Sequence, residues 1–366
     1  MTRGVVVVKV GTSSVTDEQG ALDPPAISKL AAEVAGLRAA GAKVVVVTSG
    51  AIAAGLLPLG FSGRRPADVA LLQAVSAVGQ GHLLAEWCRA LGEAGLLGGQ
   101  VLLTPHDFVD RAQYLHARQT LRILLDLGVV PVVNENDAVA DDEIRFGDND
   151  RLAALVAHLV SAELLVLLTD APGLLTADPR MDAEASLIEE IAEVDHELEA
   201  LAGGGGSDRG SGGMASKLSA AKIAAWSGVR AVIADATRPG VLTAAAADLP
   251  GMGTVVRPRS RRLAARKLWI AFAVGARGTV VVDGGAREAL TSRGVSLLPA
   301  GVVTVEGSFV ADDAVALAGP DGSVFAKGLV RHDAERLRGF AGRRSSELPG
   351  DVPAEVVHRD DLVLLP

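Results

Sequence analysis

Short apolar runs alternate with longer stretches of helical periodicity over the first two thirds of the chain. Strand-length runs cover Gly4–Val10, Lys43–Thr48, Gln100–Leu103, Val129–Val133, Leu164–Thr169 and Ala231–Ala234. Helical spacing covers Pro24–Ala40, Pro66–Ala94 with an expected break, Arg111–Leu127, Asn149–Ser161 and Met214–Ser227. Continuous Val, Leu and Ile runs are typical of strands buried on both faces, and their alternation with helices favours right-handed parallel connections. The pattern predicts an α/β fold with a parallel-dominated open sheet sandwiched by helices.

The pattern changes near residue 258. A short basic stretch, Arg257–Arg262, and a connector, Leu263–Ala271, lead into shorter apolar runs separated by Gly, Pro and Asp. These runs are Thr279–Val282, Val302–Glu306, Ala314–Ala318 and Val324–Gly328. A mostly-β unit of about 80 residues is large enough to fold alone. We therefore expect a first domain at 1–258, a connector at 259–273, a small β domain at 274–354 and a C-terminal tail at 355–366.

Composition and charge narrow the classes of protein. The chain is 49% apolar but only 3% aromatic, so aliphatic side chains must fill the core. A net charge of −9 argues against nucleic-acid binding by the whole surface, although a local basic patch stays open. The single cysteine, Cys88, excludes an internal disulfide and is expected to be a packed helical residue. No signal peptide or membrane span is evident, and we expect a cytoplasmic protein.

Polar residues follow the predicted strands, at the sheet edge where α/β folds place their chemistry. The first strand leads into Lys9, Gly11 and three hydroxyl residues, which suits a phosphate group, although a polar turn is the alternative. The second leads into Thr48–Ile52, where small residues allow a helix N-terminus to receive an anion. Either segment alone is a weak signal.

Two clusters of acids and amides give a sharper signal. Asn134–Asp137 follows the Val129–Val133 run, and Gly147–Asp150 precedes a helix. Acid and amide groups together suit the ammonium and carboxylate groups of a free amino acid, whereas each cluster alone is also typical of a solvated turn.

A further strand ends at Thr169 and Asp170, and a Gly-rich segment, Gly203–Gly213, precedes the Met214–Ser227 helix. We expect that segment to be a mobile loop. Two glycines before a helix, followed by Ser216 and Lys217, are typical of a phosphate cradle. The order of a Walker A motif is absent, and so is a Rossmann dinucleotide fingerprint.

Taken together, these segments resemble the amino acid kinase family. The matching segments occur in the family's order and span residues 1 to about 258: Val8–Ser13, Thr48–Ala53, Pro131–Val139, Gly147–Asp150, Leu168–Arg180 and Gly212–Lys217. The chain departs from the family at Leu175, where Tyr is usual, and at Ser211 and Ser216, where Thr is usual. Leu175 bears on how the adenine side of the site is lined.

The C-terminal part resembles a PUA domain, a module that often binds RNA. The resemblance is carried by Ser296–Phe309, Ala326–Val330 and Gly339–Glu347. The local basic residues are Arg331, Arg336, Arg338, Arg343 and Arg344. RNA binding through them is one interpretation, and a solvated face on a domain that serves oligomerisation or regulation is the other.

The resemblance implies a reaction and a set of roles. It implies transfer of phosphate from ATP, with Mg²⁺, to the side-chain carboxylate of L-glutamate, which would begin proline biosynthesis. The implied catalytic residues are Lys9, Lys217, Asp150, Gly11 and Gly50. The implied glutamate-binding residues are Ser49, Asp137, Asn149 and Asn134. The implied ATP-binding residues are Lys9, Thr169, Asp170, Ser211, Gly212, Gly213, Met214, Ala215, Ser216 and Lys217, and no residue is assigned as a direct metal ligand.

The resemblance also implies feedback inhibition by L-proline and assembly into a homo-oligomer, a tetramer or a dimer. Two alternatives stay open at this point. Other members of the family phosphorylate acetylglutamate, aspartate, carbamate or UMP. A protein of a different class, an RNA-binding PUA protein with an inactive kinase domain, is the second alternative.

Overall fold

The computed structural model describes residues 4–61, 65–108, 110–139, 149–178, 182, 184–203, 213–260, 262–344, 347 and 353–365. The chain forms two compact units that divide between Arg262 and Leu263. The predicted boundaries at 258 and 273 stay predictions. Of the described helices, none is long and apolar enough to cross a membrane.

The first unit contains an eight-stranded sheet in the order β3-β4-β2-β1-β5-β7-β8-β6. Its strands are β1 (Val5–Val10), β2 (Lys43–Thr48), β3 (Gly98–Leu103), β4 (Val130–Glu135), β5 (Leu164–Thr169), β6 (Glu190–Ile191), β7 (Arg230–Asp235) and β8 (Thr254–Val256). All neighbours pair in parallel except β7 and β8, which are antiparallel. The predicted parallel-dominated sheet is confirmed.

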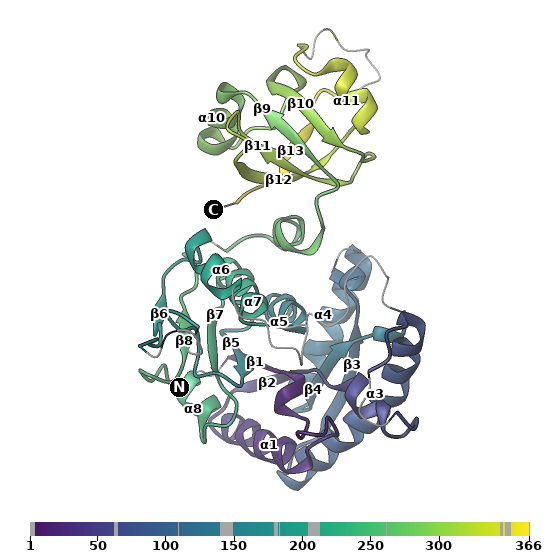
Figure 1. Cartoon of the computed structure of the whole chain (residues 1–366), viewed down its shortest axis with the longest axis vertical. Helices are drawn as coiled ribbons and strands as arrows, with labels where there is room; N and C mark the ends of the chain where they lie inside the picture. The colour runs from purple at the N-terminus through teal and green to yellow at the C-terminus, as the bar shows by residue number, and fades with distance from the viewer. Residues whose placement is uncertain are drawn as a thin grey trace. The chain divides into compact units, whose positions relative to one another are not determined.

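Helices cover both faces of this sheet (Figure 1). They are α1 (Pro24–Ala39), α2 (Ala51–Leu56), α3 (Val69–Glu93), α4 (Arg111–Asp126), α5 (Asn149–Leu159), α6 (His196–Gly203), α7 (Met214–Trp226) and α8 (Val241–Ala246). Figure 1 shows α1, α3 and α8 on one face and α4, α5 and α7 on the other. The short 3-10 segments are η1 (Thr12–Ser14), η2 (Pro105–Phe108) and η3 (Asp137–Val139).

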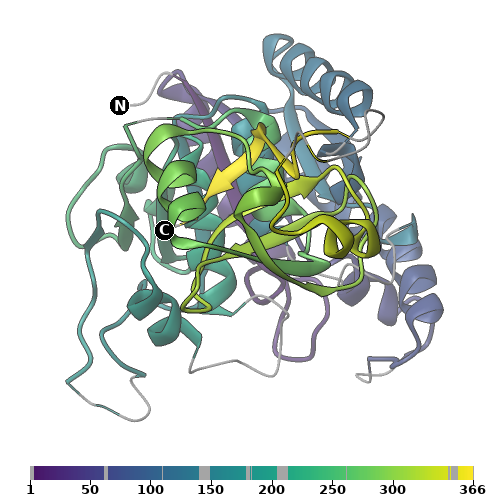
Figure 2. The ribbon, with the colours of Figure 1, turned by 90° about the horizontal axis from the view of Figure 1, so that it is seen from above.

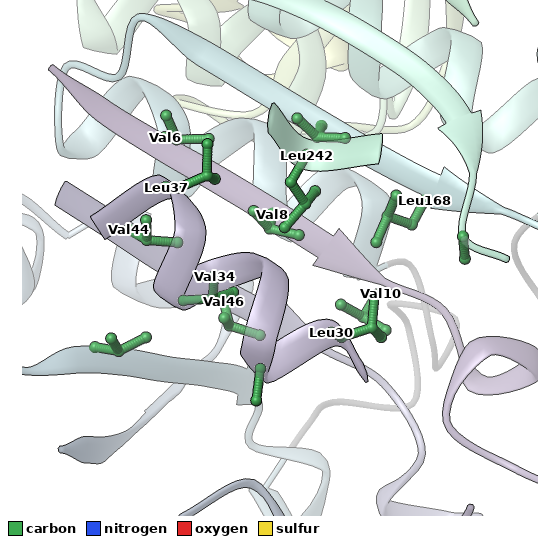
Figure 3. Packing of buried hydrophobic residues seen from close by; sticks show 14 of the residues in the cluster. Val6, Val8, Val10, Leu30, Val34, Leu37, Val44, Val46, Leu168 and Leu242 are labelled. Carbon is green, nitrogen blue, oxygen red and sulfur yellow. The ribbon is translucent and has the colours of Figure 1, made fainter. Parts of the chain in front are cut away.

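The core of the first unit is aliphatic, as the composition predicts. Figure 3 shows α1 laid across β1 and β2, with Leu30, Val34 and Leu37 packed against the strand valines. Val6 and Val44 are fully buried there. Because these strands are buried on both faces, their backbones form a rigid platform for the residues that follow them.

The break expected within Pro66–Ala94 is wrong, because α3 runs unbroken from Val69 to Glu93. Gly79 serves close packing instead: a Cβ there would lie 1.8 Å from the carbonyl oxygen of Ala51 in α2. Gly55 of α2 meets α3 just as closely, at the carbonyl of Val75. The two glycines therefore allow the backbones of α2 and α3 to touch. Cys88 is partly buried within α3, and burial raises the pKa of its thiol.

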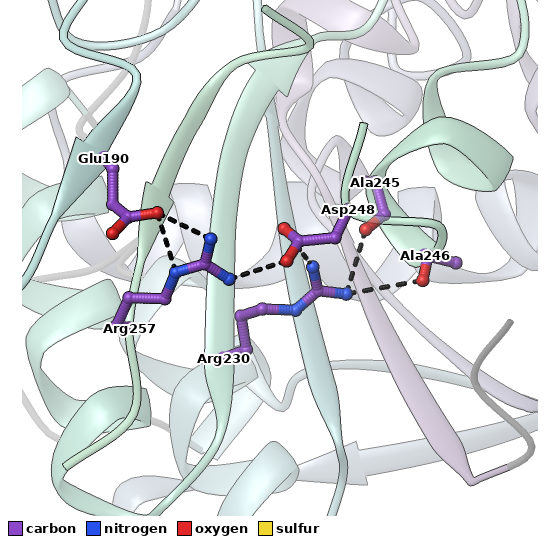
Figure 4. A network of polar contacts seen from close by, with 6 residues as sticks. All are labelled: Glu190, Arg230, Ala245, Ala246, Asp248 and Arg257. Atoms are coloured by element: carbon purple, nitrogen blue, oxygen red, sulfur yellow. Dashed lines mark hydrogen bonds and ion pairs between the residues drawn. The ribbon is translucent and has the colours of Figure 1, made fainter. Parts of the chain in front are cut away.

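A polar network holds the antiparallel edge of the sheet (Figure 4). Arg257, after β8, contacts Glu190 of β6 and also Asp248, whose other oxygen lies 2.5 Å from Arg230 of β7. Arg230 also donates to the carbonyl of Ala245 at the end of α8. Arg257, the first residue of the basic stretch, therefore stabilises this edge of the sheet.

The second unit contains a five-stranded sheet in the order β10-β9-β11-β12-β13, seen from a second side in Figure 2. Its strands are β9 (Gly278–Val282), β10 (Val302–Gly307), β11 (Ala314–Ala318), β12 (Val324–Val330) and β13 (Val357–Leu364). Its helical segments are α9 (Ala265–Leu268), η4 (Trp269–Ala273), α10 (Gly284–Arg293), η5 (Pro299–Gly301) and α11 (Ala334–Phe340). Residues 355–366, predicted to be a tail, include β13, which pairs with β12 and is therefore part of this sheet.

Candidate active site

The candidate site lies where the direction of the sheet's connections reverses. From β1 the chain builds β2, β3 and β4 on one side, and then crosses to β5 on the other side of β1. In open α/β sheets, ligands bind beyond the carboxyl ends of strands at this kind of point. Four strand ends predicted to carry chemistry, those of β1, β2, β4 and β5, are neighbours there.

Two lysines meet one buried carboxylate at this edge. Lys9 Nζ of β1 lies 2.7 Å from Asp150 Oδ1, and Lys217 Nζ of α7 lies 3.3 Å from Asp150 Oδ2. The side chain of Asp150 is fully buried and both lysines are nearly so. The structure therefore brings together the three predicted residues Lys9, Asp150 and Lys217, from three separate elements.

The charge state of Asp150 follows from its neighbours. Burial alone would raise the pKa of this carboxyl, but Lys9 and Lys217 outweigh burial and hold the pKa below its ordinary value. Ser216 adds a hydrogen bond from its hydroxyl to Asp150 Oδ2 at 3.1 Å. Asp150 is thus a buried anion that forms ion pairs with both lysines.

The backbone of Gly50 has a conformation that residues other than glycine rarely adopt. It precedes α2 with φ 108°, and a Cβ there would lie 2.9 Å from Val15 Cγ2. Gly11 has φ −77°, an ordinary value, and a Cβ there would lie 3.6 Å from Lys9 Nζ. The conformation and packing of Gly50 therefore require glycine, whereas at Gly11 the absence of a side chain leaves room beside the lysine.

The N-terminus of α7 is suited to an anion. Gly213 is its N-cap residue and makes no side-chain capping bond, so no cap side chain covers the first-turn N–H groups, which begin at Met214 and Ala215. Ser216 and Lys217 continue this turn toward Asp150. The predicted Ser211 and Gly212, and most of the Gly203–Gly213 segment, lie outside the described residues.

The β5 end supplies the other predicted nucleotide residues. Thr169 is buried and Asp170 is exposed, and the Thr169 hydroxyl donates to Asp170 Oδ1 at 3.2 Å. Leu175, the departure from the family pattern, forms a β-bridge with Leu187. Thr169 therefore stands on the strand next to that of Lys9, while Leu175 belongs to the segment that follows.

An amide chain connects the β4 end to α5. Asn149 Nδ2 donates to Ser49 Oγ at 3.0 Å and to Asn134 Oδ1 at 3.1 Å. Asn134 Nδ2 in turn donates to Gln80 Oε1 of α3 at 3.1 Å. The predicted glutamate-binding residues Ser49, Asn134 and Asn149 are thus in direct contact. Gly147 and Asp148, which precede Asn149, lie outside the described residues.

Asp137 contacts α3, the helix that carries Gln80. Its Oδ2 accepts a 2.5 Å hydrogen bond from the buried hydroxyl of Ser76, also in α3. Burial raises the pKa of Asp137, and the Ser76 hydrogen bond and the Arg65 charge offset only part of that rise. A buried carboxylate of this kind gains from a cationic partner.

Ser76 and Gln80 were not predicted from the sequence. They lie one turn apart on α3, so both project from one side of the helix. Within a long apolar helix, two polar residues at this spacing are a usable but weak signal. Helix α3 therefore supports both the acid and the amide groups of the site.

Two of the five predicted arginines of the second unit are engaged in the fold. Arg338 donates to the carbonyls of Val305 and Gly307, and Arg331 Nη1 lies 3.9 Å from Glu355 Oε2. These contacts show that at least part of the basic character there serves the unit itself.

Comparison with known proteins identifies the family. The model of the amino acid kinase family matches residues 4–235. This chain belongs to that family. The PUA domain model matches residues 278–350, so the predicted C-terminal PUA domain is confirmed as well. The fold is also similar to that of a carbamate kinase from Giardia lamblia bound to AMP-PNP, with a TM-score of 0.50, 18% identity, and coverage of 70% of this chain and 98% of that one.

The curated relatives match over nearly the whole chain. A glutamate 5-kinase of Burkholderia multivorans is 47% identical over 364 residues, which covers 98% of this chain and 97% of the relative. A glutamate 5-kinase of Mycobacterium ulcerans is 47% identical over 358 residues, which covers 98% and 96%. The similarity spans both units of the chain.

Proposed function

We propose that this protein transfers the γ-phosphoryl group of ATP to the side-chain carboxylate of L-glutamate, giving L-glutamyl 5-phosphate and ADP, as the first step of proline biosynthesis. The observation that carries the proposal is the meeting of Lys9 and Lys217 on one buried carboxylate beside the amide and acid groups of α3, β4 and α5. The full-length similarity to glutamate 5-kinases supports the same substrate.

The chemistry needs charge neutralisation rather than a base. A glutamate side chain has a pKa of about 4.3 and is ionised at neutral pH, so its oxygen can attack the γ-phosphorus without losing a proton. The new bond joins that oxygen to phosphorus, and the bond from phosphorus to the β,γ-bridging oxygen breaks. Lys9 and Lys217 would neutralise the negative charge that gathers on the transferring group. Backbone N–H groups at Gly11 and Gly50 would add donors.

The remaining residues would bind the two substrates, glutamate and ATP. Ser49, Asn134, Asp137 and Asn149 would hold glutamate. Thr169, Asp170 and the segment from Ser211 through Gly212, Gly213, Met214, Ala215 and Ser216 to Lys217 would hold ATP. Asp150, between the lysines, would set their spacing.

We expect a magnesium ion to arrive with ATP. The described residues include no group of three or more His, Cys, Asp or Glu side chains placed to bind a metal, and two lysines already engage Asp150. Mg²⁺ commonly keeps several waters and binds phosphate oxygens with few protein ligands. When bound, it would neutralise phosphate charge, and the protein's part would be to orient the phosphates through α7.

Four further properties belong to the proposal. Feedback inhibition by L-proline and a cytoplasmic location are expected from the resemblance. Assembly into a dimer or tetramer is likewise expected from the resemblance. RNA binding by the PUA domain stays a proposal, tested by affinity measured at several salt concentrations.

The direct experiment is a coupled assay of ADP release by the full chain with ATP and Mg²⁺. The acceptors are L-glutamate, N-acetyl-L-glutamate, L-aspartate, carbamate and UMP, each with and without L-proline. We expect turnover with glutamate to exceed all others and proline to reduce it. Preference for another acceptor would overturn the substrate. No turnover with any acceptor, together with salt-dependent RNA affinity, would favour the RNA-binding alternative.

A further inference from the structure

The carbonyl oxygen of Asn149 is a buried acceptor that no described residue of the protein uses. The residue is 6% exposed, and Oδ1 has no hydrogen-bond partner among the described residues. Its amide nitrogen, by contrast, donates to both Ser49 and Asn134. A buried polar atom without a partner costs free energy, so it is expected to receive a ligand.

Backbone groups of Glu135 fix the direction of the whole amide chain. The N–H of Glu135 donates to Asn134 Oδ1 at 2.9 Å, and a backbone N–H can only donate. The carbonyl of Glu135 accepts from Gln80 Nε2 at 3.1 Å, and a carbonyl can only accept. Glu135 of β4 thus fixes the orientation of the side-chain amides of Asn134 and Gln80.

The orientations of the Gln80 and Asn134 amides are consistent with each other, and together they determine the orientation of the Asn149 amide. With Nε2 turned to Glu135, Gln80 offers Oε1 to Asn134 Nδ2. With Oδ1 turned to Glu135 N–H, Asn134 can only accept from Asn149, so the NH₂ group of Asn149 must face it. The opposite orientation of Asn149 would bring two oxygens together. The free group of Asn149 is therefore an oxygen.

The ligand of that oxygen must be a donor. At neutral pH, free glutamate carries two carboxylates, which only accept, and one ammonium group, which only donates. We propose that Gln80 is a positioning residue that, through Asn134, turns the Asn149 carbonyl oxygen toward the ammonium group of the amino acid substrate. This inference rests on the proposed glutamate kinase activity and adds to it the group by which the substrate is recognised.

The test is Gln80→Met, which keeps the length of the side chain but removes both of its hydrogen bonds. Because a hydrogen bond to a charged group would be weakened, the KM for L-glutamate should rise by about tenfold or more. The kcat and the KM for ATP should change little. Glutaric acid, which has both carboxylates but no ammonium group, should inhibit the wild type and the variant with the same Ki.

Two more variants keep the result interpretable. Gln119→Met makes the same change at an exposed position of α4 and should leave every constant unchanged. Gln80→Glu keeps an acceptor for Asn134 but sets an oxygen against the Glu135 carbonyl, and should give a smaller rise in KM. If Gln80→Met fails to fold by circular dichroism, Gln80→Glu carries the test with the same readouts.

The contrary results are distinct. An unchanged KM for glutamate, or a Ki for glutaric acid that rises in parallel with it, would overturn the role of Gln80, because the second outcome indicates general damage to the site. A wild-type protein without activity on glutamate would instead overturn the proposed function.

Discussion

The ammonium group of Lys9 lies 2.7 Å from an oxygen of the Asp150 carboxylate, at the edge of the sheet where its connections reverse direction. The second oxygen of that carboxylate faces Lys217, which comes from a helix far along the chain. One buried anion therefore holds two cations at a common place. Without it, two buried ammonium groups would repel each other, and with it they are held close together.

Removal of this anion should affect both stability and turnover. Because Asp150→Asn leaves two buried lysines without their partner, the free energy of unfolding should fall by about 3 kcal/mol. Because the lysines lose their spacing, kcat should fall by about a hundredfold or more. Urea unfolding and steady-state kinetics measure the two effects. Wild-type values for both would show that Asp150 does not organise the lysines.

The pKa of Asp137 gives a pH test of substrate binding. Burial raises this pKa and the Ser76 hydrogen bond lowers it, so Ser76→Ala should raise it further. If ionised Asp137 helps to bind the glutamate ammonium group, the KM for glutamate rises as the pH falls through that pKa. In Ser76→Ala the rise should begin at a higher pH. KM profiles between about pH 5 and pH 8 measure this, and superimposable profiles would exclude the role of Asp137.

Gly50 can be compared with a glycine that has the same backbone constraint but open surroundings. Gly60 has φ 78° and no atom of the described residues within 4 Å of an added Cβ, so Gly60→Ala should cost about 1 kcal/mol for the left-handed backbone alone. Gly50→Ala should cost more, since its Cβ would meet Val15. Thermal unfolding of both variants measures the difference. Equal losses would mean that the Val15 contact relaxes without strain.

His158 should make the protein acid-sensitive. Burial, followed by the charges of Arg262 and Arg118, lowers its pKa from 6.5 to about 4. The unfolded chain therefore binds a proton below about pH 6.5, whereas the folded protein binds it only near pH 4, so stability falls as the pH falls between these values. The loss should reach about 3 kcal/mol.

His158→Gln, which does not titrate, should remove most of that slope. Urea unfolding at several pH values, carried out on the wild type and the variant, gives the comparison. A variant whose stability still falls as steeply as that of the wild type would assign the acid sensitivity to other groups.

The sequence predicts the central strands well because each ends abruptly in polar residues. Lys43–Thr48 and Leu164–Thr169 have the predicted bounds, and Lys9, Asn134 and Thr169 stand at strand ends as expected. Burial on both faces demands continuous aliphatic runs, and that demand leaves a clear pattern. The predicted edge of the sheet is therefore where the site residues meet.

The misses have physical causes. Charged residues within Val357–Leu364, such as Asp360 and Asp361, interrupt the apolar pattern that would predict a strand. The strand forms at the edge of the sheet because its backbone pairs with that of β12. The break expected within Pro66–Ala94 does not occur, and Gly79 in that helix permits the close contact with α2. Gln80 is oriented by the backbone carbonyl of Glu135, a contact that depends on the folded β4 and leaves no mark on the sequence around Gln80.

The central claim is that Lys217 stabilises the transferring phosphoryl group, and its most direct test is the kcat of Lys217→Met. Lys222→Met is the matched control, because Lys222 is also a buried lysine of α7 but pairs with Glu199 at 2.7 Å. We expect kcat to fall by about a hundredfold or more in Lys217→Met and to stay near the wild-type value in Lys222→Met, with both variants folded by circular dichroism. A folded Lys217→Met protein with near-normal kcat would contradict the account.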